Sequence, residues 1–105
     1  EMHHYEPLFK DMRQDKKLLD LFKDVMTEFG ETPRILPDDE ADGSTDVGNV
    51  SYEVPTAQPT LQIGLGLEAH TPEFTCAAGS DYGLAQAIKG AKIMAVVALR
   101  YAMCK

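Results

Sequence analysis

The last quarter of this 105-residue chain is apolar around most of a helix, and this feature limits most strongly how the chain can fold. The spacing predicts a helix over about residues 81–102, with Ser80 or Asp81 as its N-cap. Ala, Val and Met dominate nearly all sides of its second half. Its apolar positions at helical spacing define one stripe, made of Leu84, Ile88, Ala91, Met94, Ala98 and Tyr101. Because a helix that is apolar on all sides is normally buried, we expect it to need more partner surface than this chain supplies.

A second amphipathic helix is predicted after Asp15. Apolar residues recur at three- and four-residue spacings there, with charged residues between them: Leu18, Leu21, Phe22, Val25, Met26 and Phe29. Asp15 is suited to cap the start of this helix and Gly30 to end it. In the final helix, Gly90 would let a neighbouring element approach closely.

Three short segments read as β-strands. Residues 61–67 alternate apolar and other residues, and residues 50–54 alternate over a shorter run. Residues 34–36 consist of an arginine followed by two apolar residues. Residues 68–80 read as a loop. The predicted fold class is therefore α/β, with helices packed on a small mixed sheet. Such a sheet would leave exposed edges, so we expect residues 1–105 to be a single segment of a larger domain.

The charge balance excludes two classes of function. Ten Lys and Arg against seventeen Asp and Glu give a net charge of −7. A nucleic-acid binder needs a basic face, and a polybasic membrane anchor needs basic clusters, so neither is expected. The start of the chain lacks the pattern of a secretory signal, and the longest apolar run covers residues 93–99. We therefore expect a soluble, cytoplasmic protein.

The acidic loop over residues 38–49 could hold a cation. Its first half places Asp38, Glu40 and Asp42 at the ligand spacing of a calcium-binding EF-hand loop, and Asp46 follows at a later ligand position. The last position carries Asn49 where an EF-hand loop needs a bidentate Glu. A solvated acidic loop is the favoured interpretation, and a calcium site is the alternative.

Two other features could carry chemistry. His70 directly follows the predicted strand 61–67, and imidazole is both a common metal ligand and a common acid or base. A single His in a loop is compatible with a structural role as well. Residues 43–51 combine glycines, hydroxyls and a carboxylate, which suits either a pocket wall or a capped turn.

Several motifs in order resemble the C-terminal part of M20-type metallo-amidohydrolases, which include aminoacylase-like dipeptidases and aminobenzoyl-glutamate hydrolases. Residues 43–51 read GSTDVGNVS and are followed by VPT at 54–56 and LQIG at 61–64. Residues 70–74 then read HTPEF, and a long helix containing Gly and Ala follows. The resemblance covers roughly residues 15–103.

The resemblance implies a fold, an activity and a site. It implies the C-terminal part of a larger three-layer zinc-peptidase-like catalytic domain that binds two divalent metals, usually zinc. It implies hydrolysis of the amide bond of a dipeptide or an N-acyl amino acid. His70 matches the family's metal ligand in this loop, and the residues implied to face the substrate are Ser44, Thr45, Asp46 and Asn49.

The sequence also departs from the family pattern. It contains neither the upstream His-x-Asp motif nor the Glu-Glu pair that supplies the general base. Because a catalytic zinc needs three protein ligands, the chain alone should be inactive, with its partner a missing N-terminal catalytic segment. The family's dimerisation domain, absent here, would make the intact enzyme a homodimer. A non-catalytic interaction or scaffold fragment is the alternative function.

Overall fold

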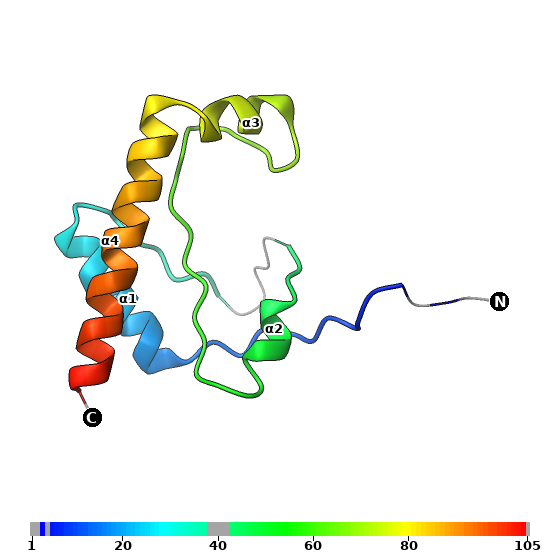
Figure 1. Ribbon diagram of the computed structural model, residues 1–105, viewed down its shortest axis with the longest axis vertical. Helices are drawn as coiled ribbons and strands as arrows, with labels where there is room; N and C mark the ends of the chain where they lie inside the picture. Colours follow the sequence, from blue (N-terminus) through cyan, green and yellow to red (C-terminus); the bar gives the residue numbers. More distant parts are fainter. Residues whose placement is uncertain (1–2, 4, 38–42, 105) are drawn as a thin grey trace.

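The described part of the chain consists of helices and extended connections. The computed structural model describes residues 3, 5–37 and 43–104. Its elements are α1 (Lys16–Glu28), α2 (Val47–Val50), α3 (Pro72–Ala78) and α4 (Asp81–Met103). Figure 1 shows α1 beside α4, α3 at the upper end of α4, and α2 next to the extended N-terminal segment. These described ranges contain no β-strand. The predicted α/β fold, with its small mixed sheet inside a three-layer domain, is therefore wrong for them.

The segment 61–67 shows why an alternating pattern did not become a strand. Strand hydrogen bonds need a second extended segment alongside, and this segment instead runs against the side of α4. Leu61 packs against the core, and a Cβ at Gly90 would lie only 3.1 Å from its Cδ1 atom. The predicted close approach at Gly90 is thus confirmed. The backbone carbonyl of Gln62 accepts a hydrogen bond from the Gln86 side chain of α4 at 2.9 Å.

The other two predicted strands and the predicted loop also differ from the structure. Residues 34–36 are irregular, and residues 50–54 form the end of α2 and the turn after it. Backbone hydrogen bonds from Glu53 and Val54 to the carbonyl of Val50 hold this turn. Within the predicted loop 68–80, the structure contains the two-turn helix α3.

The ends of α1 follow their sequence signals. The Asp15 carboxylate accepts a hydrogen bond from the backbone N–H of Leu18 at 2.8 Å, which confirms the predicted N-cap. At the other end Gly30 has a φ of 82°, and the N–H of Glu31 donates to the carbonyl of Met26 at 3.0 Å. This arrangement is a Schellman motif, in which a residue with positive φ satisfies the last carbonyls of the helix.

The core lies between α1 and α4. Its buried residues are Val25 and Met26 from α1 and Ile93 and Val97 from α4. Partly buried residues packed around them are Leu18, Leu21, Phe22, Phe29, Leu61 and Val96. The predicted apolar stripe of α1 is therefore confirmed as its packing face.

The predicted stripe of α4 is on the wrong side of the helix. Leu84, Ile88 and Met94 are 54%, 60% and 59% exposed, whereas Ile93 and Val97 face α1. Periodicity could not choose between the two sides, because both are apolar. By length and composition alone, α4 is long and apolar enough to cross a membrane. The core helix of a soluble protein can have the same length and composition.

A small polar network ties α4 to two connecting segments. Gln86 is 3% exposed, and its Nε2 atom donates to the Gln62 carbonyl and, at 3.4 Å, to Glu31 Oε1. Lys89 Nζ lies 2.6 Å from the same Glu31 oxygen. The lysine hydrogen bond is the main reason that the pKa of Glu31 lies below its ordinary value of 4.5.

Replacing Ile93 with Ala should destabilise the chain by about 2–4 kcal/mol, because it opens a cavity in a thin core. Ile88 offers a matched control on the opposite side of the same helix, and Ile88→Ala should change stability by less than about 0.5 kcal/mol. Urea unfolding of the 105-residue chain, followed by circular dichroism, measures both. Equal losses for the two variants would contradict the packing of α4 described here.

Replacing Glu31 with Gln should flatten the acid dependence of stability. Because its folded-state pKa is lowered, the carboxylate adds stability above about pH 4.5 that is lost as the pH falls through the folded-state pKa. We expect a loss of roughly 0.5–1 kcal/mol at pH 7, since the pair is partly buried. Urea titrations between pH 3 and 7 of Glu31→Gln, Lys89→Met and the double variant isolate the pair. Additive losses would show that the two side chains do not interact.

Candidate functional site

His70 lies in the turn that leads into α3. Its backbone has a φ of 64°, and its side chain is exposed. A positive φ is uncommon outside glycine, although His adopts it more readily than most residues. The imidazole makes no hydrogen bond with the described part of the chain. His70 is therefore presented outward on a turn, with both ring nitrogens available.

The residues after His70 begin a helix and fix that turn. The Thr71 hydroxyl accepts a hydrogen bond from the N–H of Phe74 at 3.2 Å and donates one to the carbonyl of Glu68 at 2.7 Å. Pro72 occupies the first turn, where its missing N–H costs nothing. Thr71 and Pro72 of the HTPEF motif thus have a local structural explanation, an N-cap followed by a proline, which does not involve the imidazole of His70.

An apolar hollow lies between the 60–67 segment and α3. Its lining consists of residues 60–64 together with Leu67 and Phe74. Phe74 comes from the HTPEF motif itself, so the hollow and His70 are carried by the same turn and helix. The hollow offers apolar contact and backbone groups, without a charged side chain in its lining.

The motif at 43–51 forms α2 and the turn before it. Thr45 Oγ1 accepts a hydrogen bond from the N–H of Val47 at 3.3 Å, which satisfies a donor at the start of the helix. Ser44 and Asp46 are exposed, whereas Gly48 is buried. A Cβ at Gly48 would collide with the backbone carbonyl of Lys10, so this close contact requires glycine.

Asn49 binds the backbone of the N-terminal segment. Its Oδ1 atom accepts from the N–H of Lys10 at 2.7 Å, and its Nδ2 atom donates to the carbonyl of Leu8 at 3.1 Å. Ser51 Oγ accepts from the N–H of Arg13 at 2.9 Å. These bonds satisfy backbone groups of an extended segment that lacks a strand partner.

Tyr52 completes this attachment. Its hydroxyl donates to Asp11 Oδ1 at 2.5 Å, and this bond lowers the pKa of Asp11 and raises the pKa of Tyr52. Lys10 Nζ and the Arg13 guanidinium lie 4.6 and 3.8 Å from the centre of its ring, within cation–π range. We call Gly48, Asn49, Ser51 and Tyr52 the clamp, and residues 8–15 the strap that it holds.

Sequence reasoning missed the strap and therefore the role of the clamp. The motif string contained Gly48, Asn49 and Ser51, but nothing in the spacing indicated that residues 8–15 would lie against them. The signal available was weak: a Gly beside an Asn and a Ser, followed by a Tyr that could stack on basic residues.

The structure does not bring the predicted site residues together. In Figure 1 the segment before α3 lies near the upper end of α4, whereas α2 lies lower, next to the N-terminal segment. Within the ranges described, no group of three or more His, Cys, Asp or Glu residues could hold a metal ion. The calcium-ligand candidates Asp38, Glu40 and Asp42 lie outside the described residues, and Asp46 is exposed.

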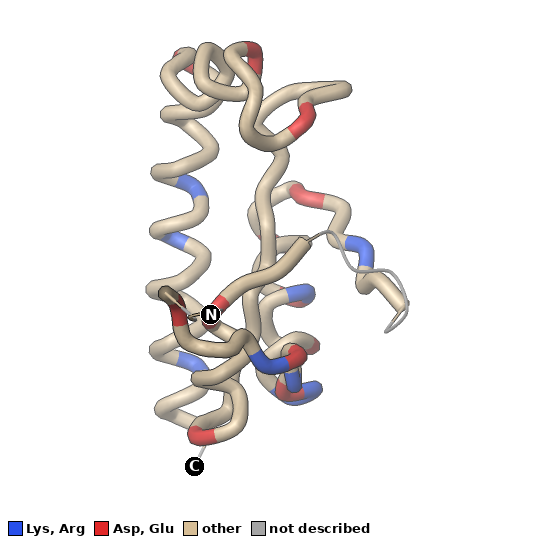
Figure 2. The backbone as a smooth tube through the Cα atoms, turned by 90° about the vertical axis from the view of Figure 1, so that its right-hand side faces the viewer, with Lys and Arg blue, Asp and Glu red and all other residues tan. Residues whose placement is uncertain are grey.

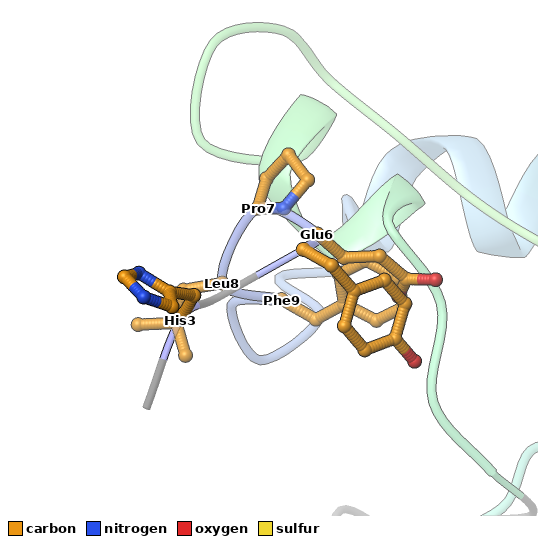
Figure 3. A pocket seen from close by; sticks show the side chains of 6 residues that line it. His3, Glu6, Pro7, Leu8 and Phe9 are labelled. Atoms are coloured by element: carbon orange, nitrogen blue, oxygen red, sulfur yellow. The ribbon is translucent and has the colours of Figure 1, made fainter. Parts of the chain in front are cut away.

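A second hollow occurs near the start of the chain. Its lining residues are His3, Tyr5, Glu6, Pro7, Leu8 and Phe9. Figure 3 shows these side chains spreading from one continuous stretch of backbone. A hollow made by a single exposed segment offers no convergent groups from other elements, so it does not define a site.

Comparison with known proteins identifies a partial similarity to a dipeptidase. A stretch of 57 residues, 54% of this chain, is 44% identical to the Xaa-Arg dipeptidases of Mus musculus and Homo sapiens. The match spans 13% of the length of each of these relatives. No family model matches the chain, and no solved structure matches it. The chain is therefore similar, over about half its length, to a small part of a dipeptidase.

Replacing Gly48 with Ala should release the strap from the clamp, because the added methyl group collides with the Lys10 carbonyl. The amides of Lys10 and Arg13 should then exchange hydrogen with solvent at least about tenfold faster, since their acceptors on Asn49 and Ser51 move away. Hydrogen exchange followed by NMR measures this effect.

Gly79→Ala is the matched control, because the nearest atom to its added Cβ would lie at an ordinary distance of 3.8 Å. It should leave both amides protected. Unchanged protection in Gly48→Ala would contradict the clamp.

Proposed function

We propose that this chain is a C-terminal segment of a metal-dependent hydrolase that cleaves the amide bond of dipeptides or N-acyl amino acids. The observation that carries the proposal is the 44% identity over 57 residues to two Xaa-Arg dipeptidases. The resemblance of the GSTDVGNVS and HTPEF motifs to M20-type amidohydrolases supports the same reaction. Because the match covers a small part of each relative, the activity belongs to a longer polypeptide.

His70 is the residue that we assign to the metal. Its exposed imidazole makes no hydrogen bond with the described residues, so either ring nitrogen could bind a cation. A catalytic zinc needs three protein ligands, and the described residues offer no cluster of that size. The chain therefore fits a role as the donor of one ligand, and segments beyond these 105 residues would supply the others. Bound zinc would make water acidic enough to act as a nucleophile near neutral pH.

We assign substrate contact to the loop that precedes α2. Ser44 and Asp46 are exposed, and they are the members of the predicted set with room to reach a substrate. Thr45 and Asn49 make hydrogen bonds to the chain itself, so they would hold the loop that presents the other two. If the substrate ends in arginine, as in the name of the relatives, the Asp46 carboxylate is a suitable partner for its guanidinium.

The partners follow from the same proposal. The missing catalytic segment supplies the general base and the remaining ligands, and a dimerisation domain outside this chain would make the enzyme a homodimer of the cytoplasm. The alternative is a non-catalytic interaction or scaffold fragment. The described residues contain no strand, so they offer no exposed sheet edge through which such a fragment could pair.

Removing the imidazole of His70 should abolish metal-dependent hydrolysis while preserving the fold. The test uses the polypeptide encoded by the complete reading frame, with an alanyl-arginine dipeptide as substrate and bound zinc measured by mass spectrometry. His70→Gly is the informative variant because glycine adopts a positive φ without strain, so the turn before α3 survives. We expect hydrolysis to fall at least about 100-fold and bound zinc to decrease.

The controls separate the imidazole from the turn. His70→Asn tolerates the same backbone conformation but lacks the imidazole, so it should be as inactive as His70→Gly. Both variants should melt within a few degrees of the original protein. Retained zinc and retained hydrolysis in His70→Gly would refute the metal assignment, and absence of dipeptide hydrolysis by the unmodified polypeptide would refute the proposed function.

A further inference from the structure

The short helix α2 has little support from the other helices. Within the described ranges it contacts none of them, and Figure 1 shows it beside the N-terminal segment. A single helical turn is too short to be stable in water by itself. The position of α2, and of the loop before it that carries Ser44 and Asp46, is therefore set by the segments attached to it.

The clamp attaches α2 to the strap at several points. Asn49 bonds the backbone of Leu8 and Lys10, and the Ser51 hydroxyl accepts from the N–H of Arg13. At its end the strap continues into α1, which packs against α4 in the core. The strap thus connects α2 to the helix pair.

Tyr52 makes the side-chain contacts of this attachment. Its hydroxyl donates to Asp11 Oδ1 at 2.5 Å, and the cationic groups of Lys10 and Arg13 lie near the centre of its ring. These three residues give the strap both kinds of charge, which Figure 2 marks in blue and red along the backbone. A hydrogen bond to a carboxylate is stronger than one between neutral groups, so it holds Tyr52 at one place on the strap.

Backbone hydrogen bonds carry the position of the clamp to Asp46. The N–H of Asn49 donates to the carbonyl of Asp46 at 2.9 Å, and the N–H of Ser51 donates to the carbonyl of Val47 at 3.1 Å. Tyr52 follows Ser51 directly in the chain. A movement of Tyr52 relative to the strap therefore also moves Asp46, whose carboxylate is the proposed partner of the substrate.

We propose that Tyr52 is a positioning residue for substrate binding, acting through its hydrogen bond to Asp11. It holds α2 against the strap and so places the Asp46 carboxylate where the guanidinium of an arginine-ended dipeptide can reach it. This inference rests on the proposed function, which assigns substrate contact to the loop before α2. It adds a residue outside the GSTDVGNVS motif and a role for the strap.

Substrate selectivity tests the proposal in the polypeptide that the complete reading frame encodes. Alanyl-arginine is compared with alanyl-citrulline, which has nearly the same shape but an uncharged side chain. Tyr52→Phe removes the hydroxyl and keeps the ring, and Asp11→Ala removes the acceptor of the same hydrogen bond. Tyr82→Phe is the matched control, because it removes a hydroxyl from an exposed tyrosine of α4.

We expect Tyr52→Phe to raise the KM for alanyl-arginine about fivefold, the size of effect expected for one hydrogen bond, and to leave kcat within about twofold. Asp11→Ala should have the same effect, and the double variant should lose no more than either alone. The KM for alanyl-citrulline and the bound zinc should stay unchanged in these variants, and the Tyr82→Phe control should match the unmodified polypeptide.

Four results would overturn the proposal. An equal fall in kcat for both dipeptides would indicate a purely structural role, and an equal rise in KM for both would show that the effect does not pass through Asp46. An unchanged KM in Tyr52→Phe would show that the hydrogen bond positions nothing. A raised KM that Asp11→Ala does not reproduce would show that the Tyr52 hydroxyl contacts the substrate itself.

Hydrogen exchange at the amide of Asn49 separates this proposal from the proposed function. We expect this amide to exchange at least about fivefold faster in Tyr52→Phe and Asp11→Ala than in the unmodified polypeptide, and at an unchanged rate in Tyr82→Phe. Faster exchange in a polypeptide that hydrolyses neither dipeptide would refute the proposed function and support the positioning of Asp46 by Tyr52. Hydrolysis with unchanged exchange and unchanged KM would overturn the positioning and support the proposed function.

Discussion

The packing of α1 against α4 is the contact on which the rest of this structure depends. Four buried apolar residues form its centre, and two ion pairs flank them across long sequence separations. Arg100 donates two hydrogen bonds to the Glu28 carboxylate, at 2.6 and 2.8 Å, and this bidentate pair lowers the pKa of Glu28. Such an exposed pair adds little stability by itself, so the buried apolar residues provide most of the stability of this contact.

The candidate functional residues lie on segments that this helix pair supports. The 60–67 segment runs along α4 and leads into the turn that contains His70. The strap leads into the start of α1 at Asp15, whose N–H donates to the Thr56 carbonyl at 2.8 Å. The clamp changes the interpretation of the GSTDVGNVS motif, because three of its five polar side chains form hydrogen bonds with the chain's own backbone. What remains for a ligand is the part of the loop before α2.

The sequence predicts some structural features of this protein correctly and others wrongly. The helix ends were predictable, since Asp15, Gly30 and Ser80 act on hydrogen bonds within a few residues of themselves. The packing stripe of α1 was predictable because its other side is polar. The strand at 61–67 was predicted wrongly, because alternation reports which side chains are covered and gives no information about a pairing partner.

The candidate site was predictable only in part. The motifs led to His70 and to the loop before α2, and the similarity to dipeptidases agrees with the reaction class that they imply. The strap could not be found from the sequence, because the contacts of Asn49 and Tyr52 reach residues about 40 positions away.

The sequence by itself therefore determined the local features: two long helices and their caps, the acidic charge, and the turn chemistry around residues 70–74. Only the tertiary structure decided which side of α4 is buried, that residues 61–67 remain unpaired, and that the clamp holds the strap. The physical reason is distance along the chain. Caps and helical periodicity are satisfied by neighbours in sequence, whereas burial and backbone pairing depend on which remote segment supplies the partner.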